Sequence, residues 1–304
     1  MRPSPSGRAR SMVDEDSPKK REEQAAEASA VEGKRAEEEV RERVRLGALA
    51  IFEIVRREGA EELRRPSSSL WWSGVAAGLA LALSAAGAAM FHAYLPDDGP
   101  ARLVVPLGYV IGFLIVIFGR LQLFTENTIA AILPLAVEFS AKNWIRVGRL
   151  WAIVFAANLF GALIAGLVFN FTPMLQPGIY DALIEISEKA VIQPWFTVFA
   201  RAVPAGFLIA ALVWMMPSSK GSEFLVVSSI IYVLVLGGFT HVVVGATEAL
   251  TLLLAGDISV WHATWGFTVP AFLGNVAGGA ALFAMLAYAQ IRDEVRTGIR
   301  GRMI

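Results

Sequence analysis

The stretch GRLQLFTENTIAAILPL, Gly119 to Leu135, places polar and charged side chains in the middle of a long hydrophobic block. These side chains belong to Arg120, Thr125, Glu126, Asn127 and Thr128. The surrounding block runs from about 103 to 136, and as one helix at ~1.5 Å per residue it would be about 50 Å long. The hydrocarbon core of a bilayer is about 30 Å thick. We therefore expect a membrane helix that is broken at this stretch.

The composition is that of a membrane protein. Of the 304 residues, 55% are hydrophobic and 18% are charged, which is more apolar than an ordinary soluble domain. Residues 69–94 contain no Asp, Glu, Lys or Arg and exceed the ~20 apolar residues that cross a bilayer. Cysteine is absent, which excludes disulfides and thiolate chemistry. We also find no acid–base pair of an enzyme, no phosphate-binding glycine loop and no metal cluster, so we expect no catalysis, no cofactor and no nucleic-acid partner.

The chain divides into four predicted segments. Residues 1–32 are rich in Ser, Pro and charge, which predicts a disordered cytoplasmic tail. Residues 33–66 have high helix propensity and predict a charged, amphipathic cytoplasmic helix. Residues 67–290 are predicted to form a six-span membrane domain, and residues 291–304 a basic cytoplasmic tail. The six apolar blocks of this domain are 70–94, 103–136, 148–171, 196–216, 223–254 and 264–288.

The loops between these blocks predict the orientation. The second loop carries Lys142, Arg146 and Arg149, and the C-terminal tail carries four more arginines. The first and third loops are mainly acidic. Because positively charged loops face the cytoplasm, both termini are expected there, in a multi-pass protein of the inner (plasma) membrane.

An internal repeat connects the two halves of this all-α domain. LFTEN at 123–127 resembles GFTHV at 238–242, and the stretch from Asn158 resembles the stretch from Asn275. The fifth block is also too long for one span, so a second break is expected around 237–250. Three spans per half would give the halves opposite orientations, which predicts a 3+3 inverted repeat whose broken second and fifth helices meet near the membrane midplane.

Polar groups inside the spans are the candidate functional residues. His241, with Thr240 before it, lies at the second expected break, and in the repeat as aligned Glu126 is its counterpart. Thr125 and Asn127 suit either the stitching of open backbone or contact with a substrate. The intramembrane charges Arg120, Arg201 and Glu248 are expected to be structural charge partners, with Arg120 neutralising Glu126. For Arg201 and Glu248 a transport role stays open beside an Arg–Glu tie between spans.

Four motifs together resemble the formate/nitrite transporter family. They are LFTENT at the first break, FTHVVVGA at the second, RAVPAGFLIAALVW in the fourth block and GNVAGG in the sixth, and the resemblance covers about 70–290. It implies an aquaporin-like fold, a homopentamer with one pore per protomer, and passage of small monovalent anions of weak acids such as formate, nitrite or hydrosulfide. It also implies that Leu123, Phe124 and Thr125 form the loop that narrows the pore and that His241 is the central pore histidine.

The sequence departs from the family pattern at three positions. Gly206 stands where an asparagine usually pairs with the histidine, Thr240 where a glutamate usually precedes it, and Glu126 where a small residue usually follows the threonine. We expect Glu126 to take over as the partner of His241.

An anion pays a large desolvation cost in an apolar constriction, and we expect Leu123 and Phe124 to form this barrier on one side, with Phe113 on the other. The histidine would attract the anion as imidazolium or give it a proton, which would couple transport to protons. Two alternatives stay open. One is a passive channel for water or small neutral solutes. The other is a non-transporting scaffold that recruits a partner through its N-terminal helix.

Overall fold

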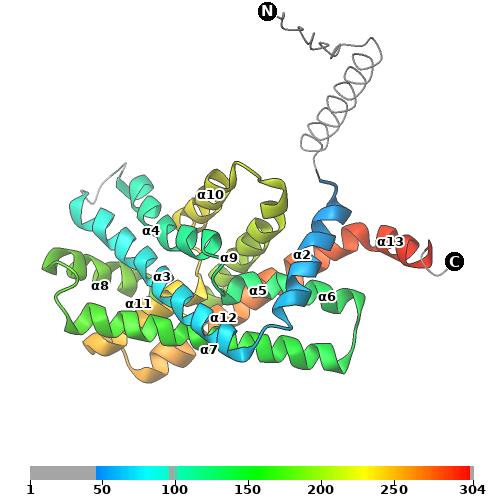
Figure 1. Cartoon of the computed structure of the whole chain (residues 1–304). Helices are drawn as coiled ribbons and strands as arrows, with labels where there is room; N and C mark the ends of the chain where they lie inside the picture. The colour runs from blue at the N-terminus through cyan, green and yellow to red at the C-terminus, as the bar shows by residue number, and fades with distance from the viewer. Residues whose placement is uncertain (1–45, 96–98, 100, 302–304) are drawn as a thin grey trace, which may run out of the picture. The chain divides into compact units, whose positions relative to one another are not determined.

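The computed structural model describes residues 46–95, 99 and 101–301. The predicted tail 1–32 and the first part of the predicted helix 33–66 lie outside the described residues. Within the described ranges every regular element is a helix (Figure 1). The first-half helices are α2 (Ala48–Glu62), α3 (Ser67–Tyr94), α4 (Ala101–Phe118), α5 (Phe124–Ala130), α6 (Ile132–Val137) and α7 (Ala141–Phe171). The second-half helices are α8 (Pro177–Val191), α9 (Trp195–Met215), η1 (Met216–Ser218), α10 (Glu223–Leu236), α11 (Val242–Ala255), η2 (His262–Thr268), α12 (Val269–Val276), η3 (Ala277–Ala284) and α13 (Met285–Gly301).

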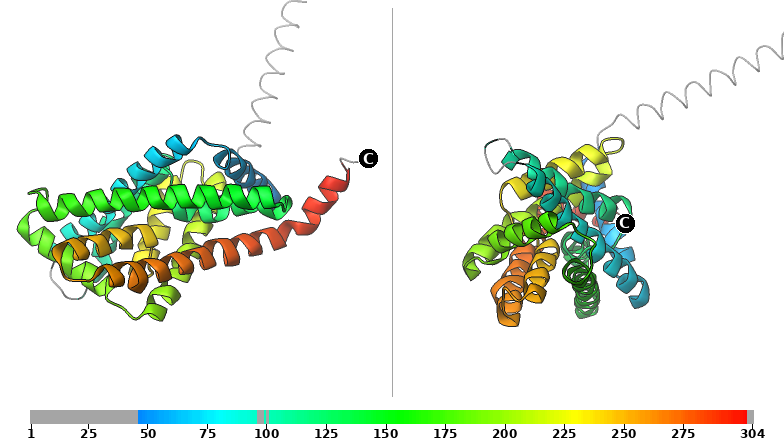
Figure 2. Two further views of the ribbon diagram at one scale, coloured as in Figure 1. Left: turned by 90° about the horizontal axis from the view of Figure 1, so that it is seen from below. Right: turned by 90° about the vertical axis from the view of Figure 1, so that its left-hand side faces the viewer.

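The chain is an all-α membrane protein. Among the described residues, four helical stretches are long and apolar enough to cross a membrane, namely Ser67–Tyr94, Ala141–Phe171, Trp195–Ser218 and His262–Asp293. The last of these runs through η2, α12 and η3 into α13 without a gap (Figure 2, left view). The predicted boundary at 290 therefore falls inside a continuous helix. Shorter apolar helices follow one another in two groups, α4 with α5 and α6, and α10 with α11.

Both long apolar blocks are interrupted where their length led us to expect it. Residues 119–123 separate α4 from α5, and residues 237–241 separate α10 from α11. The two breaks have the same backbone: Arg120 and Gly238 both adopt positive φ angles, 48° and 63°. Positive φ is the conformation that commonly ends a helix, and it usually requires glycine. Arg120 adopts this positive φ although it is not a glycine.

Two buried asparagines fix the breaks in the same way. Asn158 on α7 accepts a hydrogen bond from the Phe124 amide at 2.9 Å and donates to the Gln122 carbonyl at 2.9 Å. Asn275 on α12 accepts from the Val242 amide at 2.9 Å and donates to the Thr240 carbonyl at 2.9 Å. Each amide group also donates to a neighbouring membrane helix, at the carbonyls of Gly74 and Ala202. The open backbone of each break is thus paired inside the protein.

These bonds correct the alignment of the repeat. The residue before the first helical residue is Leu123 at α5 and His241 at α11, and both have extended backbone. Leu123 is therefore the structural counterpart of His241, and the alignment of LFTEN with GFTHV is wrong by three residues. Glu126, the predicted counterpart of His241, instead corresponds to Val244.

Two helical segments differ from the sequence prediction. α7 begins at Ala141 rather than near 148, because the Ser140 hydroxyl caps it by accepting from the Asn143 amide. The third loop, which we had not predicted to be helical, contains α8. Pro177 stands at its start, where proline suits a helix, and Ile179 and Leu183 are buried. α8 packs on α3 and α11, and so covers one end of the broken-helix region.

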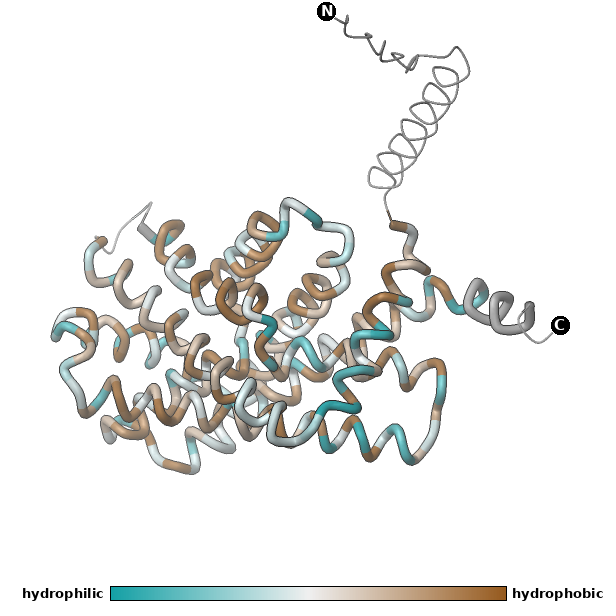
Figure 3. The backbone as a smooth tube through the Cα atoms, viewed as in Figure 1, coloured by the Kyte–Doolittle hydropathy of each residue, from teal (hydrophilic) through white to brown (hydrophobic). Residues whose placement is uncertain are grey.

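The helix α2 is docked on the membrane domain. Its second half is hydrophilic (Figure 3), while Phe52 and Val55 on its other side are buried. A side chain on Gly59 would collide with the carbonyl oxygen of Ala130, the last residue of α5. The Gln122 side chain, in the first break, donates to the Glu62 carboxylate at 2.9 Å. α2 therefore contacts the backbone that follows the first break.

Replacing Gly59 by valine is expected to undock α2. Overpacking against backbone typically costs about 1–3 kcal/mol, which corresponds to roughly fivefold to hundredfold faster hydrogen exchange of the α2 amides. Gly47→Ala at the start of the same helix is the matched control, because a Cβ there meets nothing within 4 Å. Equal exchange rates of α2 in the Gly59→Val and wild-type proteins would contradict this docking.

Candidate functional site

The two breaks meet through one hydrogen bond between His241 and Thr125. The Nε2 atom of His241 lies 2.8 Å from the Thr125 hydroxyl oxygen, and both side chains are buried. The Nδ1 atom of His241 accepts from the Val244 amide at 3.4 Å and so caps α11. Since an accepting ring nitrogen carries no proton, the proton of the neutral ring is on Nε2 and is donated to Thr125. The histidine therefore joins the two halves of the repeat as a hydrogen-bond donor.

Apolar side chains surround this pair. Phe113 packs edge-on against the His241 ring, with ring centroids 5.0 Å apart. Phe113, Leu123 and Phe124 are fully or almost fully buried. The ring of Phe124 stacks on Phe272 and also contacts Phe155, each at a centroid distance of 4.9 Å. Phe124 is thus a packing residue beside the pair, and it lines neither of the two cavities of this region.

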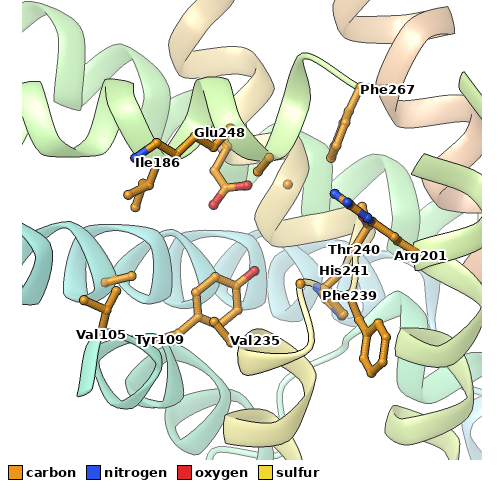
Figure 4. Close-up of a pocket in the computed structure, with 15 residues that line it drawn as sticks. Val105, Tyr109, Ile186, Arg201, Val235, Phe239, Thr240, His241, Glu248 and Phe267 are labelled. Atoms are coloured by element: carbon orange, nitrogen blue, oxygen red, sulfur yellow. The ribbon is translucent and has the colours of Figure 1, made fainter. Parts of the chain in front are cut away.

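A cavity of about 250 Å³ lies on one side of the His241–Thr125 pair and is named here the α8-side cavity. Its polar lining consists of Tyr109, Lys189, Arg201, Thr240, His241 and Glu248. In Figure 4 the carboxyl group of Glu248 and the hydroxyl of Tyr109 point into this space. Arg201 and Glu248 therefore face the same volume, next to the central histidine, whereas the ammonium of Lys189 pairs with the Glu185 carboxylate and its side chain is 63% exposed.

A second cavity, of about 340 Å³, lies next to α2 and is named the α2-side cavity. Its lining is strongly acidic and contains Glu58, Glu61, Glu62, Glu126 and Glu223 together with Arg120, Gln122 and Asn127. Arg120 lies 3.9 Å from Glu58. Burial raises the pKa of Glu58, Arg120 opposes that shift, and Glu61 and Glu62 add to it. The two cavities therefore differ in the sign of their lining charges.

The predicted partnership between Glu126 and His241 is wrong. Both nitrogens of His241 are engaged by Thr125 and Val244, while Glu126 lines the α2-side cavity. The reason is the corrected register, which places Glu126 in the first turn of α5, three residues beyond the counterpart of the histidine. Arg120 lies 3.9 Å from Glu58 and lines the same cavity as Glu126, so its predicted charge interaction with Glu126 stays a prediction.

The other predicted charge partners share one cavity without a direct bond. Arg201 and Glu248 both line the α8-side cavity, but within residues 46–95, 99 and 101–301 no ion pair joins them. Both side chains can therefore interact with a molecule in this cavity rather than with each other.

Gly206 is explained by packing. A Cβ atom at this position would collide with the backbone carbonyl of Asn275, so α9 can approach α12 this closely only with glycine. An asparagine side chain at position 206 could not be accommodated in this arrangement. Its usual role as the partner of the histidine falls to Thr125 from the opposite break.

Sequence reasoning missed four residues of this region. Asn158 and Asn275 were used only to align the repeat, although an amide side chain in the middle of each apolar span was a signal for backbone pairing. Tyr109 lies inside an apolar block, and Lys189 lies in the unpredicted helix α8. No motif near Tyr109 or Lys189 in the sequence indicated that these side chains line a cavity.

Comparisons with known proteins agree on one family. The family model described as "Formate/nitrite transporter" matches residues 49–289. The chain is 36% identical to the inner membrane protein YfdC of Escherichia coli over 82% of this chain and 80% of that protein. It is 23% identical to the formate channel FocA of Haemophilus influenzae over 71% of this chain and 84% of that protein.

Two solved structures share the fold. An ion channel of the FNT family matches with a TM-score of 0.69 at 16% identity, covering 79% of this chain and 98% of that chain. A pentameric formate channel with formate bound matches with a TM-score of 0.60 at 18% identity, covering 73% of this chain and 96% of that chain. At these identities the structures support the arrangement of the helices and leave the site to be argued from its own residues.

Proposed function

The chain belongs to the formate/nitrite transporter family, and from that premise we propose that it is a membrane channel for small monovalent anions of weak acids, of the formate or nitrite type. It is therefore a transporter-family protein and not an enzyme. The observation that carries the proposal is the hydrogen bond between His241 and Thr125, which joins the two helix breaks between two polar cavities. A polar contact shared by two helix breaks, with a cavity large enough for water on each side, is typical of a substrate path through a membrane domain.

The proposed architecture has six spans in a 3+3 inverted repeat of aquaporin-like form, within the proposed membrane domain 67–290. The four long helices supply four spans, and α4 with α5–α6 and α10 with α11 supply the two broken ones. Support comes from the matching positive-φ residues and from the matching asparagine bonds of the two breaks. We further propose a homopentamer in the inner membrane, with both termini in the cytoplasm and residues 291–304 as a basic cytoplasmic tail.

In this orientation the α8-side cavity faces outward and the α2-side cavity faces the cytoplasm. Arg201 attracts the anion into the outer cavity. Between the cavities, the substrate passes Phe113 and Leu123, where an ion without its hydration shell pays several kcal/mol or more. The neutral acid pays far less, and the hydroxyl of Thr125, whose oxygen accepts the Nε2–H of His241, can donate its own hydrogen to the acid at the narrowest point. The substrate therefore crosses this point as the neutral acid.

A flux panel in liposomes tests the proposed function. Purified full-length protein is reconstituted, and uptake of formate, nitrite, hydrosulfide, acetate and lactate is compared with the permeation of water and glycerol. We expect at least one weak acid to enter about tenfold faster than in protein-free liposomes, which corresponds to lowering the crossing barrier by about 1.4 kcal/mol. Protein-free liposomes and liposomes with an unrelated membrane protein are the controls. Faster water or glycerol permeation without any weak-acid flux would favour the passive neutral-solute channel instead.

A further inference from the structure

Glu248 is a buried carboxyl group that the proposed path has not used. It lies on α11, two turns beyond His241, and only 6% of it is exposed. Its carboxyl group points into the α8-side cavity (Figure 4). Within residues 46–95, 99 and 101–301 it has no hydrogen-bond or ion-pair partner. A carboxyl group in this position is costly to keep within a membrane domain, and such groups commonly mark proton or ion paths.

His241 is poorly placed to exchange a proton with the substrate. Its Nε2–H is donated to Thr125, and its Nδ1 lone pair accepts the Val244 amide. The ring could bind a second proton only if Nδ1 released that amide, which is an N-terminal donor of α11. His241 can therefore donate a hydrogen bond in this arrangement, whereas the proton that makes the acid neutral has to come from another group.

Resting on the proposed function, we propose that Glu248 is the residue that exchanges a proton with the substrate in the α8-side cavity. The substrate anion is held there by the positive charge of Arg201. The O–H bond of the Glu248 carboxyl group breaks, and a new O–H bond forms on an oxygen of the substrate carboxylate. The neutral acid moves on to the His241–Thr125 pair. The Glu248 carboxylate then takes a proton from water on the outer side of the cavity, and the cycle closes.

The surroundings of Glu248 suit this exchange. The titratable groups that share its cavity are Tyr109 from α4, Lys189 from α8, Arg201 from α9 and His241 at the start of α11. The elements α3 and η2 contribute only apolar side chains to the lining. Arg201 stabilises both the arriving anion and the carboxylate that Glu248 leaves after transfer, whereas the charge of Lys189 is balanced by its ion pair with Glu185 on α8. The volume of about 250 Å³ leaves room for the anion and water together, since one water takes up about 30 Å³.

The test measures substrate and proton movement together in proteoliposomes. Formate uptake and the internal pH are followed over an external pH series for wild type, Glu248→Gln, Glu248→Asp and Glu188→Gln. Gln keeps the size and hydrogen bonding of Glu but cannot transfer a proton. Glu188 is exposed on α8 and does not line the cavity, so its substitution is the matched control.

In the wild type and Glu188→Gln, formate and protons enter together and the rate rises as the external pH falls. For Glu248→Gln we expect a rate about tenfold to a hundredfold lower and a flat pH profile, because a positioned general acid is commonly worth that much or more. Glu248→Asp is expected to restore a pH dependence at a reduced rate, with the profile shifted along the pH axis from that of the wild type.

The outcomes separate the two proposals. A wild type that moves no weak acid would refute the proposed function. A wild type that moves formate, with Glu248→Gln giving the same rate and pH profile, would overturn the role of Glu248 alone. Loss of flux in both Glu248 variants, with no pH dependence restored by Asp, would assign Glu248 to packing and also overturn it. If Glu248→Gln does not elute like the wild type in gel filtration, an unchanged pH profile in Glu248→Asp overturns the proposal and a shifted profile supports it.

Discussion

Asn275→Leu should lower the free energy of unfolding by roughly 2–6 kcal/mol, and Asn158→Leu by a similar amount. Each asparagine side chain makes three hydrogen bonds to backbone groups. Two of these groups lie in a break and have no partner within a helix, and the third is a carbonyl of a neighbouring membrane helix. Leucine fills about the same volume but leaves a buried amide and a buried carbonyl of the break without partners. Each such group costs about 1–3 kcal/mol, and membrane interior offers no water to replace the lost bond. This loss is a large part of the total stability of a typical domain.

Unfolding by SDS in mixed detergent micelles measures the effect. Asn170 is the matched control, because its side chain also makes three hydrogen bonds, with Gly166, Thr251 and Tyr180. Both carbonyls it contacts lie inside helices, so Asn170→Leu should cost distinctly less. If the Asn275 and Asn170 variants lost the same stability, the asparagines would not be the groups that hold the breaks.

Thr125→Val should reduce weak-acid flux roughly tenfold to a hundredfold while the protein remains folded. The hydroxyl of Thr125 is the acceptor for His241 Nε2–H, and valine has the same shape without it. A buried donor without an acceptor costs about 1–3 kcal/mol, and each 1.4 kcal/mol is a factor of ten. The substitution also removes the hydroxyl that we expect the neutral acid to contact at the narrowest point.

Thr125→Ser is the conservative control, since it retains the hydroxyl and loses one methyl group. It should keep most of the flux. Formate uptake by proteoliposomes at one pH, normalised to the amount of reconstituted protein, measures both variants. A Val variant as active as the Ser variant would mean that the His241–Thr125 bond is structural and outside the substrate path.

Much of the fold could be predicted from composition and length. The spans follow from apolar blocks, and the two breaks follow from the comparison of 34 residues, 103–136, with the thickness of a bilayer. The prediction that His241 lies at a break was correct. These features depend on local properties of the chain, because a helix in hydrocarbon has to satisfy its own backbone whatever its neighbours are.

The partners of the candidate site residues were not predictable in the same way. The alignment of LFTEN with GFTHV put Glu126 opposite His241, whereas the folded chain puts Leu123 there. Three residues advance a helix by about 4.5 Å, so this slip in register moves the side chain away from the break along α5, where it lines the other cavity. Gly206, which the sequence marks only as a departure, is fixed by its close contact with Asn275.

The sequence by itself thus determined that the chain enters a membrane, where its helices break, and which polar residues lie near the breaks, because hydropathy and length act locally. Tertiary structure alone decided that His241 bonds to Thr125, that Glu126 and Glu248 face different cavities, and that α8 brings Lys189 to one of them. Those outcomes depend on how far helices approach and rotate against one another. That geometry is set by contacts such as those of Gly206 and Asn275, which are far apart along the chain.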